Sequence, residues 1–351
     1  MAEIFIEDED EAVNAVEACD LYERYRFVVD KGQNLLRIDK YLSNMLSDAI
    51  SRTRIQEAAD AGFIKVNDKI IKSNYRVKPL DVITVSLNTP PPDFTVYPEN
   101  IPLEIAYEDN DVLVVNKRAG MCVHPALGND NGTLLNALGW YFKDDENFDA
   151  NNQQIGLVHR IDKDTSGLLL VAKNEYAKTF LSKQFEEKTT ERTYNALVWG
   201  VLKNDAGTIT GDIARDRSDR QRFTVYPEGE NPKAKRSITH YRVLKRFAYT
   251  TLVECKLETG RTHQIRVHFK HIGHPLFSDS KYGGNEIIKG NLFAKYRQFV
   301  TNCFEICPRQ ALHAKTLGFT HPTTKEFMQF NSDLPNDMVK LIEKWEKYSI
   351  N

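Results

Sequence analysis

The chain has 351 residues, 41% of them hydrophobic, and a formal net charge of −2. This length suits one large domain with a small one, or two medium domains. The sequence contains no apolar run of membrane-spanning length, no signal-peptide pattern at its N-terminus and only five scattered cysteines, which form no disulfide framework. We therefore expect a cytoplasmic protein with no membrane partner.

The small net charge hides an asymmetry along the chain. Residues 1–30 contain ten acidic residues and two arginines, whereas residues 31–78 contain ten lysines or arginines and five acidic residues. The first segment is predicted to be a disordered acidic tail. The basic segment that follows it favours a module that binds nucleic acid.

Residues 31–89 are predicted to form that module as a small α/β domain. Hydrophobic periodicity predicts helices over residues 35–46 and 51–59 and strands over residues 63–67 and 82–85. The runs Arg37-Ile38-Asp39-Lys40-Tyr41-Leu42, Ser51-Arg52 and Ala61-Gly62-Phe63-Ile64-Lys65-Val66-Asn67 resemble the S4 RNA-binding fold. The resemblance implies phosphate contacts by cations of the two helices, which are Arg37, Lys40, Arg52 and Arg54. The alternative is a solvated basic face.

A second, larger domain is predicted beyond a linker. Residues 90–99 begin with Pro90-Pro91-Pro92, which favours a stiff extended connection. Residues 100–351 alternate between strand-like and helix-like segments, and hairpin-like pairs such as 238–244 with 251–257 favour a mixed, largely antiparallel sheet. The predicted fold class is therefore α+β.

The most informative run of the larger domain is residues 156–167. Asp162 lies between a short hydrophobic segment and Thr165-Ser166-Gly167, and the apolar run 168–172 that follows is typical of a buried strand. Asp162 is thus predicted to lie in a loop next to a core strand, flanked by Arg160 and Lys163. A carboxylate on a rigid scaffold beside cations suits a nucleophile or a base.

This run also resembles a known motif. His159-Arg160-Ile161-Asp162, two further residues and Thr165-Ser166-Gly167 resemble the active-site motif of RluA-type RNA pseudouridine synthases, with Ile161 where the family has Leu. The S4-like module, His124-Pro125 with the run 132–138, and Lys163-Asp164 are most similar to the RluD-type enzymes of large-subunit ribosomal RNA. The resemblance implies isomerisation of uridine in 23S rRNA by base flipping, with no cofactor and no metal.

The resemblance assigns three catalytic residues. Asp162 is the catalytic carboxylate, either as a nucleophile at C1′ or as a base at C2′ of the ribose. Tyr194, in the strand-like run 191–200, is expected to stack on the flipped uracil and to accept the C5 proton. Arg266 is expected to pair with Asp162 and to keep it in one rotamer, from the first turn of a helix whose predicted N-cap is Thr262.

Further residues are assigned to substrate binding. Ile265 is expected to be an apolar wall of the pocket, and Arg160 and Arg261 are expected to contact the RNA. A cluster of arginines between two predicted strands favours an RNA-facing loop that includes Arg220; its members are Arg215, Arg217, Arg220 and Arg222. Four histidines between residues 263 and 274 do not share a helical face and are interpreted as helix-surface and turn residues rather than metal ligands.

Two other functions remain open at this stage. The same fold could belong to a non-catalytic RNA-binding or ribosome-assembly factor. A nucleoside or glycoside hydrolase is the second alternative. That class usually needs two carboxylates at a set separation, but Asp164 is only two residues from Asp162 in a turn, and no second acid has a matching context. The expected partner is ribosomal RNA or the pre-ribosomal large subunit, and we expect a monomer.

Overall fold

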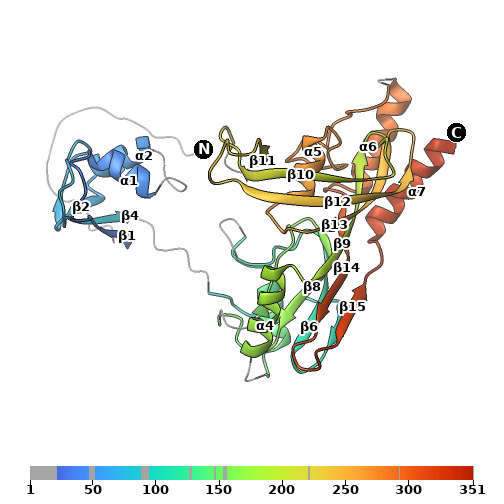
Figure 1. Ribbon diagram of the computed structural model, residues 1–351, viewed down its shortest axis with the longest axis horizontal. Coiled ribbons are helices and arrows are strands. Elements are labelled where there is room, and N and C mark those ends of the chain that lie inside the picture. The colour runs from blue at the N-terminus through green and yellow to red at the C-terminus, as the bar shows by residue number, and fades with distance from the viewer. Residues whose placement is uncertain are drawn as a thin grey trace, which may run out of the picture. The chain divides into compact units, whose positions relative to one another are not determined.

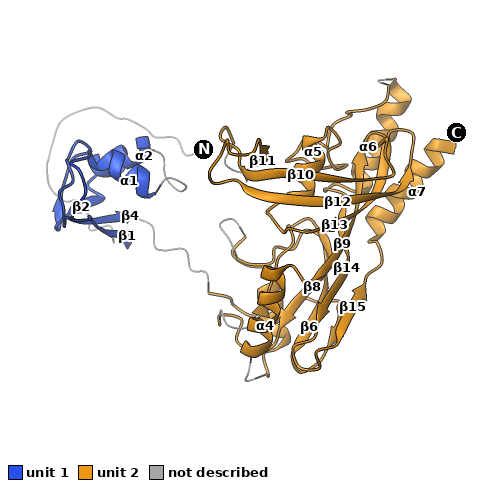
Figure 2. Cartoon of the chain, viewed as in Figure 1, with its two compact units in different colours: residues 1–93 blue, residues 94–351 orange. Residues whose placement is uncertain are grey.

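The computed structural model describes residues 22–46, 52–87, 95–125, 129–145, 148–152, 156–219, 222–291 and 293–350. The chain divides into two compact units, residues 1–93 and residues 94–351 (Figure 2). Four predicted features lie outside the described residues: most of the acidic segment, the helix start at Ser51, the prolines 90–92 and Arg220. None of the described helices is long and apolar enough to cross a membrane.

Among its described residues, the first unit combines two helices with a four-stranded antiparallel sheet in the order β1-β4-β2-β3 (Figure 1). Its elements are β1 (Tyr22–Val28), α1 (Ile38–Met45), α2 (Arg52–Asp60), β2 (Ile64–Val66), β3 (Lys69–Ile70) and β4 (Val82–Leu87). Asn67 and Asp68 both have positive φ, as a two-residue hairpin turn between β2 and β3 requires. The core is formed by apolar side chains of both helices and of the sheet, among them Ile38, Leu42, Ile55, Ile64 and Val85.

The prediction of a tail over residues 1–30 is wrong for residues 22–28. These residues form β1, which pairs with β4 from Tyr22 opposite Leu87 to Val28 opposite Val82. The run alternates: Tyr25 and Phe27 pack against the core while Arg26 is exposed. The high density of acids over the whole segment concealed this short period-2 pattern. The small domain therefore begins before residue 31.

The second unit is built on an 11-stranded sheet in the order β11-β10-β12-β13-β9-β14-β8-β6-β5, with β15 on β14 and β7 on β8 (Figure 1). The strands are β5 (Ile105–Glu108), β6 (Val112–Lys117), β7 (Gly156–Leu157), β8 (Ser166–Ala172), β9 (Glu191–Trp199), β10 (Ala206–Arg215), β11 (Phe223–Tyr226), β12 (Lys235–Arg246), β13 (Thr250–Leu257), β14 (Leu312–Thr320) and β15 (Phe327–Asn331). Among these, β14 and β8 pair in parallel, and the other pairs are antiparallel. The prediction of an α+β fold with a mixed, largely antiparallel sheet is confirmed.

Helices cover both faces of this sheet. They are α3 (Leu134–Tyr141), α4 (Glu175–Glu187), α5 (Gln264–His271), α6 (Ala294–Ile306) and α7 (Asn336–Ile350). Every residue of β8 is buried, because alternate side chains pack on opposite sides. Leu169 joins the core that includes residues of α3 and α5, and Leu170 joins the core under α4. The helices α6 and α7 close a third core around Trp199 and Trp345.

Candidate active site

Asp162 lies in the loop between β7 and β8, and the backbone of this loop is fixed by groups from distant segments. The amide of Thr165 donates to the Asp162 carbonyl at 3.1 Å. The next two carbonyls, of Lys163 and Asp164, each accept a hydrogen bond at 2.9 Å, from Lys117 Nζ and from an Arg309 guanidinium nitrogen. The position of Asp162 is therefore set by β6 and by the segment before β14.

Lys117 is fully buried at the end of β6. Its ammonium group also donates to the carbonyls of Arg118 and Met121, each at 2.8 Å. Burial lowers the pKa of Lys117 to about 7, and the nearby Asp164 carboxylate partly opposes this shift. Three carbonyl acceptors use all three N–H donors of the protonated form. Lys117 therefore acts as a structural clamp on the loop.

The carboxylate of Asp162 is bound by Arg266. Arg266 donates to Asp162 Oδ2 at 2.8 Å and, through two other nitrogens, to both carboxylate oxygens of Asp279 at 2.7 and 2.9 Å. Asp279 is fully buried, and the Asp162 side chain is 20% exposed. Asp279 thus fixes the guanidinium from behind, and one nitrogen remains to orient Asp162. Asp279 is not among the site residues predicted from the sequence.

Arg266 is positioned by a tight turn at the start of α5. The helix begins at Gln264 after His263, which has a φ of 56°, so the prediction of Thr262 as the N-cap is wrong. The Gln264 side chain closes the turn, because its oxygen accepts from the Thr259 hydroxyl and the Arg261 amide. Its nitrogen donates to the Ile238 carbonyl of β12. This buried amide fixes the turn that leads into α5, and no side chain caps the helix itself.

These elements surround a cavity of about 460 Å³. The residues predicted to form the site and found at this cavity are Arg160, Asp162, Tyr194, Arg261, Ile265 and Arg266. Ile265 is buried and Tyr194 is 7% exposed, whereas Arg160 and Arg261 are exposed. The cavity therefore combines an apolar, partly enclosed floor with a cationic rim, and its volume suits one nucleoside.

Tyr194 on β9 lies on the floor of the cavity. Burial raises the pKa of its phenol, which the neighbouring Arg192 partly opposes and Asp162 reinforces. The phenol is thus neutral at neutral pH. A neutral phenol ring can stack on a base. The phenol oxygen can accept a further proton only if it releases its hydroxyl proton to another group.

Sequence reasoning missed two residues that line the cavity. Arg192 is 9% exposed, its guanidinium lies 5.1 Å over the Phe185 ring, and its Nε atom has no hydrogen-bond partner within the described part of the chain. His263 lies with Nε2 at 3.9 Å from Asp162 Oδ1. His263 does lie in a turn, as interpreted from the sequence, but its place beside the carboxylate was not expected. The interpretation as a helix-surface residue is wrong for His268, which is fully buried in α5.

Besides Arg160 and Arg261 at the cavity, the residues predicted to contact RNA lie in two other places. Arg37, Lys40, Arg52 and Arg54 are all exposed on the helices of the first unit or directly before them. Arg37 and Arg52 both donate to the buried Asp39 carboxylate. In the second unit, Arg215 at the end of β10 and Arg222 just before β11 flank the loop that was predicted to face RNA.

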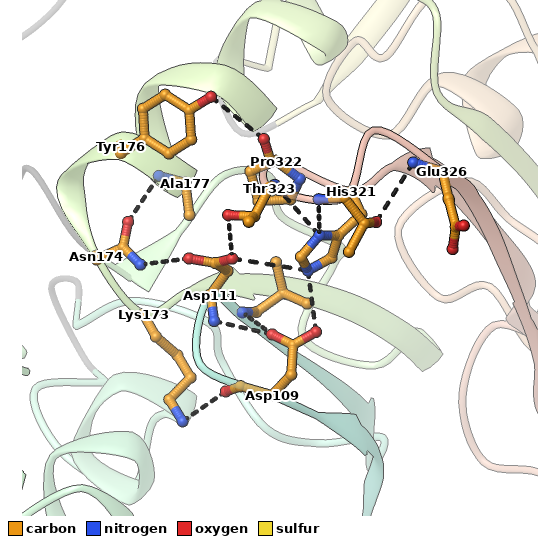
Figure 3. A network of polar contacts seen from close by, with 12 residues as sticks. Asp109, Asp111, Lys173, Asn174, Tyr176, Ala177, His321, Pro322, Thr323 and Glu326 are labelled. Carbon is orange, nitrogen blue, oxygen red and sulfur yellow. Dashed lines mark hydrogen bonds and ion pairs between the residues drawn. The ribbon is translucent and has the colours of Figure 1, made fainter.

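The described residues contain one group of ligand-type side chains close enough together for a metal, namely Asp109, Asp111 and His321 (Figure 3). Its atoms are engaged in other contacts. His321 Nδ1 accepts from backbone amides that include Thr323, so Nε2 donates to Asp109 at 2.9 Å. Asp111 accepts from the side chains of Asn174 and Thr323. This network ties the β5–β6 turn to the segment after β14, which is a structural role.

The first unit is a module of the kind that binds RNA, and the second unit holds an arginine-bound aspartate in a nucleoside-sized cavity. Together these features define an RNA-modifying enzyme. The family model for RNA pseudouridylate synthase matches residues 111–271, and the model for the S4 domain matches residues 36–83. The chain is 46% identical over 311 residues to an uncharacterized RNA pseudouridine synthase of Bacillus subtilis. The aligned region covers 89% of this chain and 94% of that protein.

Two further relatives carry a more specific name. Ribosomal large subunit pseudouridine synthase D of Zymomonas mobilis is 38% identical over 309 residues, covering 88% of this chain and 93% of that protein. The protein of the same name from Haemophilus influenzae is also 38% identical, covering 87% and 90%. The chain therefore belongs to the RNA pseudouridine synthase family and is an enzyme that isomerises uridine in RNA.

Solved structures agree with this assignment. Human RNA pseudouridylate synthase domain containing 1 superposes with a TM-score of 0.50 at 27% identity, covering 66% of this chain and 83% of that one. Human RNA pseudouridylate synthase domain containing 4 superposes with a TM-score of 0.54 at 22% identity, covering 69% and 93%, which supports the fold.

Proposed function

We propose that this enzyme converts specific uridines of large-subunit ribosomal RNA to pseudouridine, with Asp162 as its catalytic residue. The names of the relatives from Zymomonas and Haemophilus support the choice of RNA. The observation that carries the catalytic assignment is the 2.8 Å contact between Arg266 and Asp162 Oδ2 inside the cavity of about 460 Å³. This contact leaves Oδ1 as the oxygen free to react.

The reaction is a rearrangement within one nucleotide. The bond from C1′ to N1 of uracil breaks, the base turns, and C1′ bonds to C5, whose proton is then lost while N1 gains one. Asp162 either attacks C1′ or removes the C2′ proton, and both routes use a fixed, charged oxygen next to the ribose. The buried floor formed by Tyr194 and Ile265 limits access of water to the intermediate.

Tyr194 is proposed to hold the detached uracil. The raised pKa of the phenol favours a neutral ring that stacks on the base, which retains the base while it turns. Transfer of the C5 proton to the phenol oxygen then requires the phenol to hand its own proton on. Stacking is therefore the better supported role.

Access to the cavity requires the uridine to leave its stack. Flipping costs on the order of a few kcal/mol, which contacts to the flanking phosphates must offset. Arg160 and Arg261 on the cavity rim and the arginines that flank the β10–β11 loop are proposed to provide such contacts. The S4-like module of the first unit, with Arg37, Lys40, Arg52 and Arg54, is proposed to bind a further part of the RNA.

The test compares Asp162→Asn with the wild-type enzyme on a ribosomal RNA fragment. We expect loss of pseudouridine formation by at least about 1,000-fold with unchanged RNA affinity, because the amide cannot act as nucleophile or base. Near-normal turnover in the variant would show that Asp162 is not the catalyst. Absence of product from the wild-type protein would favour a non-catalytic assembly factor, and release of free uracil would favour a hydrolase.

The ribosomal substrate has its own test. Pseudouridine is mapped chemically in ribosomal RNA from cells with and without this protein. We expect loss of the modification at particular large-subunit uridines. We expect the enzyme to act in the cytoplasm, where ribosomes are assembled, and to be active as a monomer. Unchanged large-subunit maps would refute the proposed RNA while leaving the enzyme class intact.

A further inference from the structure

Two hydrogen bonds link strand β11 through Tyr282 to His263, whose ring faces the catalytic carboxylate. The backbone amide of Phe223, the first residue of β11, donates to the Tyr282 hydroxyl oxygen at 3.1 Å. The Tyr282 oxygen lies 2.8 Å from Nδ1 of His263. The other ring nitrogen of His263, Nε2, lies 3.9 Å from Asp162 Oδ1. This series of contacts therefore ends on the oxygen that Arg266 leaves free.

The contacts assign the protons of this series. Burial raises the pKa of Tyr282 to about 12 and lowers the pKa of His263 to about 4, which Asp162 only partly opposes, so the phenol is protonated and the imidazole is neutral. Among the described residues, the acceptor available to the Tyr282 proton is His263 Nδ1. The single ring proton of His263 is then on Nε2, which faces the carboxylate.

The ring of His263 is held in place by packing as well. His263 has a φ of 56°, a left-handed conformation that few residues other than glycine adopt without cost. Phe223 and Tyr282 pack against the imidazole edge-on, each with its ring centroid at 5.6 Å. The turn and the two rings thus direct Nε2 towards Asp162 at the expense of backbone strain.

We propose that His263 is a positioning residue for Asp162 and that it couples docking of RNA on the β10–β11 hairpin to catalysis. This inference rests on the proposed function of Asp162. Arg266 fixes Oδ2, and the Nε2–H group of His263 fixes Oδ1 when bound RNA closes the gap of 3.9 Å. A neutral donor orients the reactive oxygen without adding a second cation that would reduce its reactivity.

The coupling between RNA docking and catalysis follows from the residue at which this series of contacts begins, which is Phe223. Phe223 stands at the start of β11, next to Arg222, and the Arg215 guanidinium lies 5.3 Å over its ring. Contact of these arginines with phosphate would shift β11, and the Phe223 amide of β11 fixes the Tyr282 hydroxyl. A correctly docked RNA therefore sets the last hydrogen bond of Asp162, and a poorly docked one does not.

The first test is Tyr282→Phe, which removes one oxygen atom and keeps the ring that packs on His263 and under the Arg266 guanidinium at 5.0 Å. We expect the single-turnover rate at saturating RNA to fall about 10- to 100-fold, because Asp162 loses a fixed position. The RNA dissociation constant should stay within about twofold, since no RNA contact is removed. A purely structural role would instead lower thermal stability without this selective loss of rate.

Variants of His263 complete the test. His263→Leu should lose as much rate as Tyr282→Phe, and the double variant should be no slower than His263→Leu, because both changes break one series of contacts. His263→Gln keeps an N–H group at similar reach and should recover most of the rate. Nitrogen-15 shifts of the His263 ring should report the Nε2–H tautomer in the wild type and a mixture in Tyr282→Phe.

The outcomes separate the two proposals. A wild-type enzyme that forms pseudouridine, with variants that retain its rate or a ring that carries its proton on Nδ1, overturns the role of His263 and leaves the proposed function standing. A wild-type protein that forms no pseudouridine overturns the proposed function, and the role of His263 falls with it. Selective rate loss together with the Nε2–H tautomer supports both.

Discussion

At the scale of single residues, Arg192 is a buried cation without a carboxylate partner. It is 9% exposed, and within the described residues its Nε atom has no hydrogen-bond partner and its guanidinium forms no ion pair. A buried cation without a carboxylate lowers stability unless another group meets it. Breaking the glycosidic bond leaves negative charge on the uracil ring, which a guanidinium in the same cavity can stabilise. We therefore interpret Arg192 as a partner for the detached base.

Arg192→Met should consequently raise stability and lower activity at once. We expect the free energy of unfolding to increase by about 1 kcal/mol, since the methionine stem can keep the packing on Phe185 without a buried charge. The single-turnover rate should fall about 100-fold. Urea denaturation and rapid-quench assays measure the two effects. Lys188→Met, at an exposed cation of the same cavity, is the control and should change neither quantity strongly.

At the scale of elements, the conformation of the Asp162 loop depends more on the hydrogen bonds from Lys117 than on the loop's own sequence. Lys117→Met removes all three donors to the carbonyls of Arg118, Met121 and Lys163 while nearly preserving volume. We expect a loss of at least about 3 kcal/mol in stability, because buried acceptors stay unsatisfied. The rate should fall about 100-fold through displacement of the loop. Arg118→Met, at the exposed neighbour, is the matched control.

In the first unit, the buried Asp39 organises the cations predicted to bind RNA. Burial favours a higher pKa for Asp39, but hydrogen bonds from Gln56, Arg37 and Arg52 outweigh it and lower the pKa to about 2. Its carboxylate oxygens lie 2.7 to 3.2 Å from these donors. The two guanidinium groups are therefore presented in fixed positions, although their side chains remain about half exposed.

Asp39→Ala separates preorganisation from net charge. Removal of a negative charge would strengthen RNA binding if only the net charge mattered. We expect the opposite, roughly tenfold weaker binding, because two arginines must then be ordered on binding. Filter binding at fixed salt measures the dissociation constant, and a thermal melt shows whether the unit stays folded. Asp60→Ala, at an exposed acid of α2, should not weaken binding; equal effects at both positions would contradict the role of Asp39.

At the scale of the whole molecule, the sequence predicts elements better than it predicts contacts between them. The apolar run of β8 and the alternation over β12 and β13 were readable because burial on a strand leaves a local pattern. The pair of Asp162 and Arg266 spans 104 positions and was expected only from the family resemblance. Asp279, Arg192 and His263 have no local signature, because packing between distant segments places them. Arg192 and His263 line the cavity, and Asp279 holds Arg266 from behind.

The stability of the catalytic unit towards acid should be set by its buried histidines. Burial lowers the pKa values of His159 to about 3 and of His263, His268 and His313 to about 4. In the unfolded chain each ring titrates near 6.5. Between pH 6.5 and pH 4 the unfolded state therefore binds more protons than the folded state, so stability falls as the pH falls.

The expected loss is about 2 kcal/mol for each of these rings between pH 7 and pH 5. Urea unfolding of the full chain, followed by the fluorescence of the buried Trp199 and Trp345, reports the catalytic unit across this range. His313→Asn, which keeps polar atoms next to Ser166 and Ser332, should flatten the pH dependence by about one ring's share. An unfolding free energy that stayed constant from pH 7 to pH 5 would mean that these rings take up protons in the folded state. Any carboxylate with a lowered pKa, such as Asp39 in the first unit, acts mainly below this window, since in the unfolded chain it is half protonated only near pH 4.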